Sequence, residues 1–182
     1  TAFVTLWKLG YARESFTHGR TICDFIEEHR LDRQSPIHHP LCVALVVFYA
    51  RPFKRSNVIG AIPATMVPKD NRFLHGQILA MRDQVAAHTD GNPANHGEGG
   101  LPMKNVRVSI GNDGTRSLNI YELKFSADAI RQIRALAEIL SGKTTYHIER
   151  RWRKMASQIP GVPGEYLMDL ESETFRNIQS PR

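Results

Sequence analysis

The chain has 182 residues, of which 41% are hydrophobic and 23% are charged, and its formal net charge is +6. This length can bury a core without metal or disulfide support, and the composition is that of a globular protein and not of a disordered chain. The positive charge permits an anionic partner such as RNA but does not require one. We expect a single domain over residues 1–182.

No stretch of the sequence has the pattern of a targeting or membrane-spanning segment. The start, Thr1 to Gly10, has no basic flank followed by an apolar stretch. The longest apolar run, residues 41–50, is about half of what spans a bilayer. Cys23 and Cys42 are too few for a disulfide framework, so we expect reduced core thiols, with a single disulfide left open. These features favour a cytoplasmic protein with no membrane partner.

The first half of the sequence predicts three helices. Residues 5–30 carry apolar side chains at helical spacing. Pro40 suits the first position of a second helix, which would end near residue 50, although this apolar run also fits a buried strand. Asp70 can cap a third helix over residues 71–88.

The second half predicts a hairpin followed by a long helix. Strands over 104–110 and 117–125 flank Asn112-Asp113-Gly114, a strong hairpin signal, and their alternation predicts a face packed on the bundle. Ser126 can cap a fourth helix that ends near residue 155. The rest, about 157–182, is expected to form an irregular arm. The fold class is mainly α, an up-and-down helical bundle with one inserted antiparallel β-hairpin.

The third helix carries the most informative pattern. Its apolar stripe of Leu74, Ile78, Met81 and Val85 ends at His88. Arg82 lies about 9 Å from His88 along the axis and about 120° away. His88 is interpreted either as a packed residue at the helix end or as one edge of a cleft shared with Arg82. His75 lies on the same helix face as Arg82. The narrow stripe also leaves apolar surface that predicts a homodimer.

A family resemblance supports the cleft interpretation. The segment from Arg82 through Asp83 to His88 resembles the signature of HEPN-type proteins, an arginine and a polar residue followed by a histidine at a helix end. Tyr49-Ala50-Arg51-Pro52-Phe53 and Leu74-His75 are also similar to bacterial HEPN-like proteins. The resemblance covers mainly residues 41–90, less than a third of the chain.

The resemblance implies a metal-independent endoribonuclease without a cofactor, often working across a two-fold dimer. Arg82 would stabilise the phosphorane-like state, His88 would handle the proton and Asp83 would orient one of them. It also implies a role in bacterial stress or defence, with an antitoxin or another partner protein. The alternative is a non-catalytic helical scaffold, in which Arg82, Asp83, His88 and Asp90 form a structural polar network.

Further residues are candidates for RNA contact. Arg150, Arg151, Trp152 and Arg153 interleave an aromatic ring with cations, which suits backbone contact and base stacking. They also fit a solvated helix end where cations complement the dipole. Arg51 and His75 are candidates near the cleft, and Arg51 alternatively pairs with a carboxylate such as Asp83 or Asp90. The histidines lack metal-ligand spacing, so no metal is expected.

Overall fold

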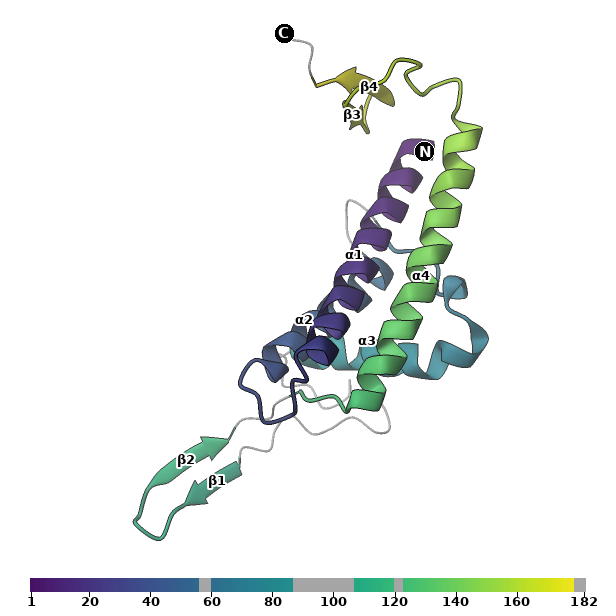
Figure 1. The fold of residues 1–182 in the computed structure, drawn as a ribbon. Coiled ribbons are helices and arrows are strands. Elements are labelled where there is room, and N and C mark those ends of the chain that lie inside the picture. Colours follow the sequence, from purple (N-terminus) through teal and green to yellow (C-terminus); the bar gives the residue numbers. More distant parts are fainter. Residues whose placement is uncertain (56–59, 87–106, 120–122, 179–182) are drawn as a thin grey trace.

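The computed structural model describes residues 1–55, 60–86, 107–119 and 123–178, without the side chains of 84–86, 107–108 and 117–119. Two long helices, α1 (Ala2–Glu28) and α4 (Ala127–Lys154), run antiparallel side by side (Figure 1). Hydroxyls cap both: Thr1 accepts from the Val4 N–H, and Ser126, the predicted cap, accepts from the Ala129 N–H. The mainly helical bundle predicted from periodicity is confirmed.

Two shorter helices complete the described bundle. Helix α2 (His38–Ala50) packs on α1, and α3 (Arg72–Ala86) packs on α2. The run at 41–50 is therefore a helix and not a strand. It lies between α1 and α3, and one of its sides is deeply buried. The 3₁₀ turns η1 (Arg51–Phe53), η2 (Ala64–Met66) and η3 (Lys69–Asn71) join α2 to α3. Asp70 lies within η3 instead of capping α3.

The core fills the space among these helices. Its largest fully buried side chains include Phe16, Tyr49, Leu45, Ile78, Ile130, Ile133, Leu136 and Leu140. Cys23 and Cys42 are buried and form no disulfide, as predicted. Within the described part of the chain, no helix combines the length and apolar character needed to cross a bilayer.

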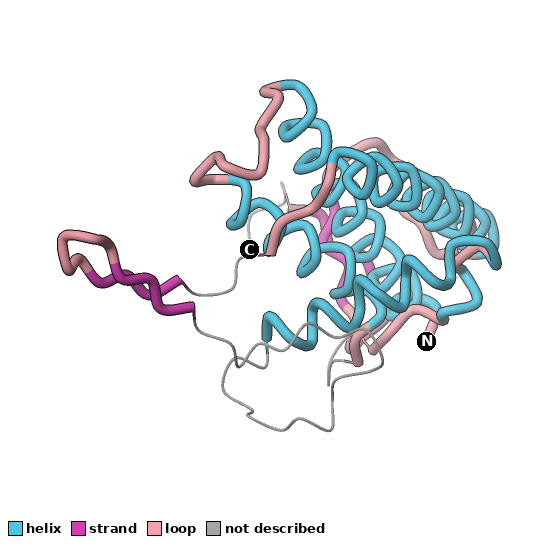
Figure 2. Tube along the Cα trace, turned by 90° about the horizontal axis from the view of Figure 1, so that it is seen from below, coloured by secondary structure: helices cyan, strands magenta, loops and turns pink. Residues whose placement is uncertain are grey.

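The first hairpin, β1 (Arg107–Ile110) with β2 (Arg116–Asn119), exists but does not pack as predicted. It projects away from the helices (Figures 1 and 2), residues 109–116 are exposed, and Ile110 is 70% exposed. Polar residues at the tip fit this exposure, because Ile110 is paired with Arg116 and Ser109 with Ser117. The predicted strands extended into residues 104–106 and 120–122, which lie outside the described residues. Leu123 and Phe125 are buried, but they lie outside any strand, in the segment that leads into α4.

The C-terminal arm was predicted to be irregular, and this was wrong. Strands β3 (Tyr166–Asp169) and β4 (Thr174–Asn177) pair as a second antiparallel hairpin. The Asp169 carboxylate accepts hydrogen bonds from the Glu171 and Ser172 N–H groups and shapes the turn. The Phe175 ring lies 5.1 Å from Phe3, which anchors the hairpin at the start of α1.

Candidate functional site

Arg82 and Asp83 belong to a surface ion-pair cluster where α3 passes the segment after η1. Lys54 Nζ donates to Asp83 Oδ2 at 2.6 Å, and Arg82 Nη1 donates to Oδ1 at 3.1 Å. Burial alone would raise the pKa of Asp83, but the hydrogen bonds and charges of Lys54 and Arg82 outweigh it and lower the pKa. The carboxylate is therefore ionised between two cations, and the cluster keeps a net positive charge.

The other predicted members of the cleft are distributed differently. His88 and Asp90 lie outside the described residues. Arg51 does not pair with Asp83, whose partners are Lys54 and Arg82, and the other carboxylate expected for it, Asp90, is not among the described residues. Its guanidinium lies 5.0 Å from the centre of the Tyr11 ring and 6.0 Å from that of Phe48. Within the described part of the chain, the neighbours of this cation are therefore aromatic faces.

His75, expected to share a face with Arg82 and contact RNA, belongs to the core. It is 7% exposed, its Nδ1 shares a 3.0 Å hydrogen bond with the Tyr49 hydroxyl, and its ring lies 4.4 Å from Phe53. Burial lowers its pKa, so the ring is held neutral. A buried ring with one nitrogen engaged fits a packing role, and we leave His75 out of the proposed interface.

The basic segment at the end of α4 divides between two faces of that helix. Arg150 and Arg151 line a groove, whereas Trp152 and Arg153 do not. Trp152 packs on the small cluster of Leu6, Leu9 and Ile148, with Phe175 6.2 Å away. Arg153 has an 81% exposed side chain, with its only described ionic neighbour, Glu149, 3.9 Å away. Two of the four predicted contact residues therefore share one surface.

The groove is a cavity of about 700 Å³ between α4, the start of α1 and residues 63–66. Five basic side chains of α4 line it: Lys143, His147, Arg150, Arg151 and Lys154. They repeat every three or four residues and so form one stripe on the helix. Among the residues described, no carboxylate lines the groove. Lys143 Nζ donates to the Met66 carbonyl at 2.9 Å and ties the two walls together.

Sequence reasoning missed Lys143, Tyr146 and His147 as members of this surface. The signal was present, because each lies three, four, seven or eight residues before Arg150 or Arg151 on a predicted helix. The opposite wall had no such signal, since residues 63–66 come close only through the packing of the bundle.

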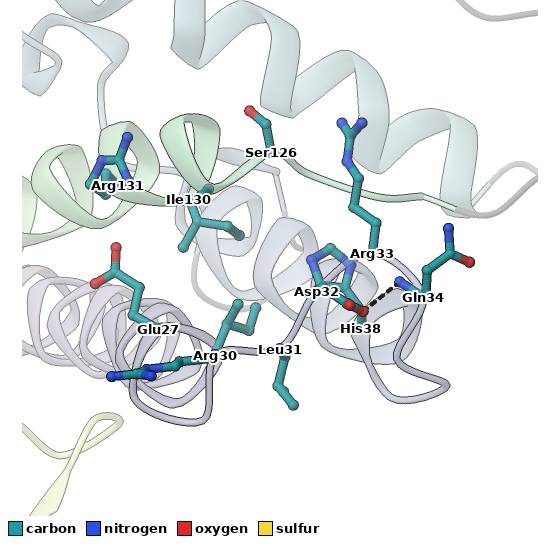
Figure 3. Close-up of a pocket in the computed structure, with 12 residues that line it drawn as sticks. Glu27, Arg30, Leu31, Asp32, Arg33, Gln34, His38, Ser126, Ile130 and Arg131 are labelled. Atoms are coloured by element: carbon teal, nitrogen blue, oxygen red, sulfur yellow. Dashed lines mark hydrogen bonds between the residues drawn. The ribbon is translucent and has the colours of Figure 1, made fainter.

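A second cavity, of about 810 Å³, lies between the end of α1, the turn at 30–34 and the start of α4 (Figure 3). Its lining mixes acidic and basic side chains, and several already hold the turn. Asp32 accepts from the Gln34 and Ser35 N–H groups, and Arg33 donates to the Lys124 and Phe125 carbonyls. This mixture indicates no particular ligand class, so we assign no site there.

Two buried thiols and a buried histidine lie near this second cavity without forming a nucleophilic site. Cys42 Sγ lies 3.4 Å from His38 Nδ1, but Cys42 is fully buried and burial raises the pKa of its thiol. Burial also raises the pKa of Cys23 to about 12. Such thiols stay protonated and are weak nucleophiles. Within the described ranges, no three His, Cys, Asp or Glu side chains converge as a metal-binding group.

Comparisons with protein-family models, with curated proteins and with solved structures give no match. Functional assignment therefore depends on the groove of α4 and on the Arg82 cluster.

Proposed function

We propose that this protein binds RNA, with the phosphate backbone lying in the groove along α4. The observation that carries the proposal is the lining of that groove by five basic side chains and no described carboxylate. Cations that neutralise phosphates release condensed counterions and donate charge-assisted hydrogen bonds. The net charge of +6 supports the same partner class by attracting polyanions over longer distances.

The alternative of a solvated helix end accounts for only part of this stripe. A helix dipole favours cations in the last turn, and its effect fades beyond that turn. Lys154 ends α4 and fits that explanation. Lys143, however, lies about three turns earlier. Lys143 is too far from the helix end to gain from the dipole, but it already donates to the Met66 carbonyl. Arg150 lies before the last turn and lines the groove, so it is the cation that favours a ligand.

The proposal is tested by fluorescence anisotropy with a labelled RNA. We expect Arg150→Ala and Arg151→Ala each to weaken binding several-fold, since a charge-assisted contact contributes on the order of 1 kcal/mol. Arg153→Ala is the matched control, because it removes the same charge from the same segment outside the groove. If all three variants bind like the wild type, the groove is not the RNA site.

A second candidate function, HEPN-like RNA cleavage, is favoured by the accessibility of the Arg82 cluster. The Arg82 side chain is 35% exposed, whereas a structural network would bury it, and Lys54 helps to offset the charge of Asp83. Under this proposal Arg82 supplies positive charge and hydrogen-bond donors to the scissile phosphate. Asp83 orients the Arg82 side chain. His88 moves the proton, because histidine titrates near neutral pH.

The cleavage proposal is tested by incubating purified protein with total RNA and a chelator. We expect wild-type protein to cut, and Arg82→Lys to cut poorly because an ammonium does not reproduce the bidentate guanidinium fork. His88→Ala should lose cleavage with an unchanged melting temperature. Undiminished cleavage by His88→Ala would refute the assignment, and loss of both activity and thermal stability would favour the structural network.

A further inference from the structure

We propose that the groove of α4 selects single-stranded RNA and that Tyr146 is the side chain on which a base stacks. This inference rests on the proposed RNA-binding function and adds the form of RNA to it.

The groove has two chemically different sides. The stripe on α4 is cationic, whereas the floor and the opposite wall include Leu9, Pro63 and Met66. A single strand has the same division, with a charged backbone along one edge and aromatic bases along the other. Leu9 and Met66 also pack in the core, whereas Pro63 is exposed and offers its apolar ring to a ligand.

Tyr146 is placed to receive a base. It lines the groove, is 59% exposed, and has no hydrogen-bond partner for its hydroxyl among the residues that the structure describes. Its ring meets His147 edge-on at 5.5 Å and 72°, which leaves ring surface open to solvent. Lys143 and Arg150 lie about one turn to either side on the same helix. A base stacked on Tyr146 would therefore keep its neighbouring phosphates close to cations.

Trp152, the aromatic residue that the sequence favoured for stacking, is already used by the fold. Its ring packs on the apolar cluster at the start of α1 and lies near Phe175 of β4. The contrast between the two rings assigns stacking to Tyr146.

Other polyanions match the groove less well. A duplex stacks its bases inside and presents phosphates outside, so the apolar side would face no partner. A bilayer surface is flat and offers no strand that can enter a groove. Base–aromatic stacking with backbone contact is instead the usual mode of binding to single strands.

The test compares labelled oligouridine, the same strand annealed to oligoadenine, and phosphatidylserine vesicles, using the full chain. We expect the single strand to bind more tightly than the duplex, and the vesicles to bind weakly. Tyr146→Leu should weaken single-strand binding by about fivefold or more, whereas Tyr146→Phe should bind like the wild type because it keeps the ring. Thermal melting of both variants checks that the fold is retained.

The outcomes separate this inference from the function on which it rests. If neither the single strand nor the duplex binds, RNA binding itself is refuted. Tighter binding to the vesicles than to RNA would also refute it. Equal binding of the strand and the duplex, with no effect of Tyr146→Leu, would leave RNA binding intact and overturn the inference. Equal loss of affinity in Tyr146→Leu and Tyr146→Phe would also overturn it, because the hydroxyl and not the ring would then be responsible.

Discussion

At the scale of single residues, the Tyr49–His75 pair is a polar contact inside an apolar core. Removing the hydroxyl with Tyr49→Phe leaves His75 Nδ1 buried without its 3.0 Å partner. We expect a loss of about 1–3 kcal/mol in the free energy of unfolding, measured by urea denaturation. Tyr146→Phe is the control and should change stability by less than about 0.5 kcal/mol, because its hydroxyl is at the surface. Equal effects would mean that the buried hydrogen bond does not contribute.

The buried histidines also predict how stability depends on pH. Burial lowers the pKa of His75 from 6.5, and burial with the charges of Lys124 and Arg33 lowers that of His38, opposed by Asp32. The unfolded chain then binds more protons than the folded chain below about pH 6.5, so stability is present above that pH and falls as the solution is acidified. We expect the melting temperature to drop between about pH 7 and 5.

A His75 variant checks the source of this pH dependence. His75→Gln keeps a polar side chain but does not titrate, so its melting temperature should fall less steeply over the same range. An unchanged slope would place the pH dependence in other groups.

At the scale of elements, α4 carries a glycine at a position that needs none. Gly142 is exposed in the helix interior, and an added Cβ would meet no atom within 4 Å. We expect Gly142→Ala to stabilise the protein by about 0.5–1 kcal/mol, seen as a higher melting temperature. Gly60→Ala is the contrast and should destabilise it, because Gly60 has φ +72° and its Cβ would lie 3.1 Å from Lys8 Nζ. A lower melting temperature for Gly142→Ala would contradict the prediction.

The positions of the long helices could be predicted because local sequence signals determine where they begin and end. Caps and 3.6-residue periodicity located α1 and α4 to within a few residues, with Ser126 as an example. The second hairpin was missed because a Pro- and Gly-rich stretch precedes it and its strands are only four residues long. Its stability depends on Phe175 packing against Phe3, a contact between the two ends of the chain that no local pattern encodes.

Members of the groove could be predicted from the sequence only where basic residues recur at helical spacing on one helix. Arg150 and Arg151 were named from the sequence as candidates for RNA contact, and both line the groove, while the contact with RNA stays a prediction. Tertiary packing determines which aromatic ring stays open to solvent, because β4 approaches Trp152 and leaves Tyr146 exposed. Likewise, the pairing of Lys54 with Asp83 joins residues 29 positions apart, and no periodicity connects them.

At the scale of the whole molecule, the predicted homodimer stays a prediction, and the described part of α3 covers only some of the apolar surface on which it relied. The prediction relied on uncovered apolar surface along the third helix. Ile78 is 1% exposed, and Leu74 and Met81 pack against the core of the same chain. Phe73, at the start of α3, is 78% exposed, so part of this helix still offers apolar surface to a second copy. Light scattering that gives the 20.6 kDa mass of one chain at micromolar concentration would contradict the homodimer.

The whole-molecule charge and the groove make separable contributions to RNA binding, and two triple variants distinguish them. The groove variant replaces Arg150, Arg151 and Lys154 with alanine. The control variant replaces three cations that do not line the groove, namely Arg13, Arg116 and Arg131. Each lowers the formal net charge from +6 to +3, so any long-range attraction falls by a similar amount in both.

The salt dependence of binding reports how many phosphates are contacted directly. For single strands the slope of log K against log salt concentration is about −0.7 per neutralised phosphate. Loss of three contacts should therefore make the slope of the groove variant shallower by about 2, while the control keeps the wild-type slope. Anisotropy titrations over a series of KCl concentrations measure both slopes. If both variants flatten the slope equally, net charge and not the groove binds the RNA.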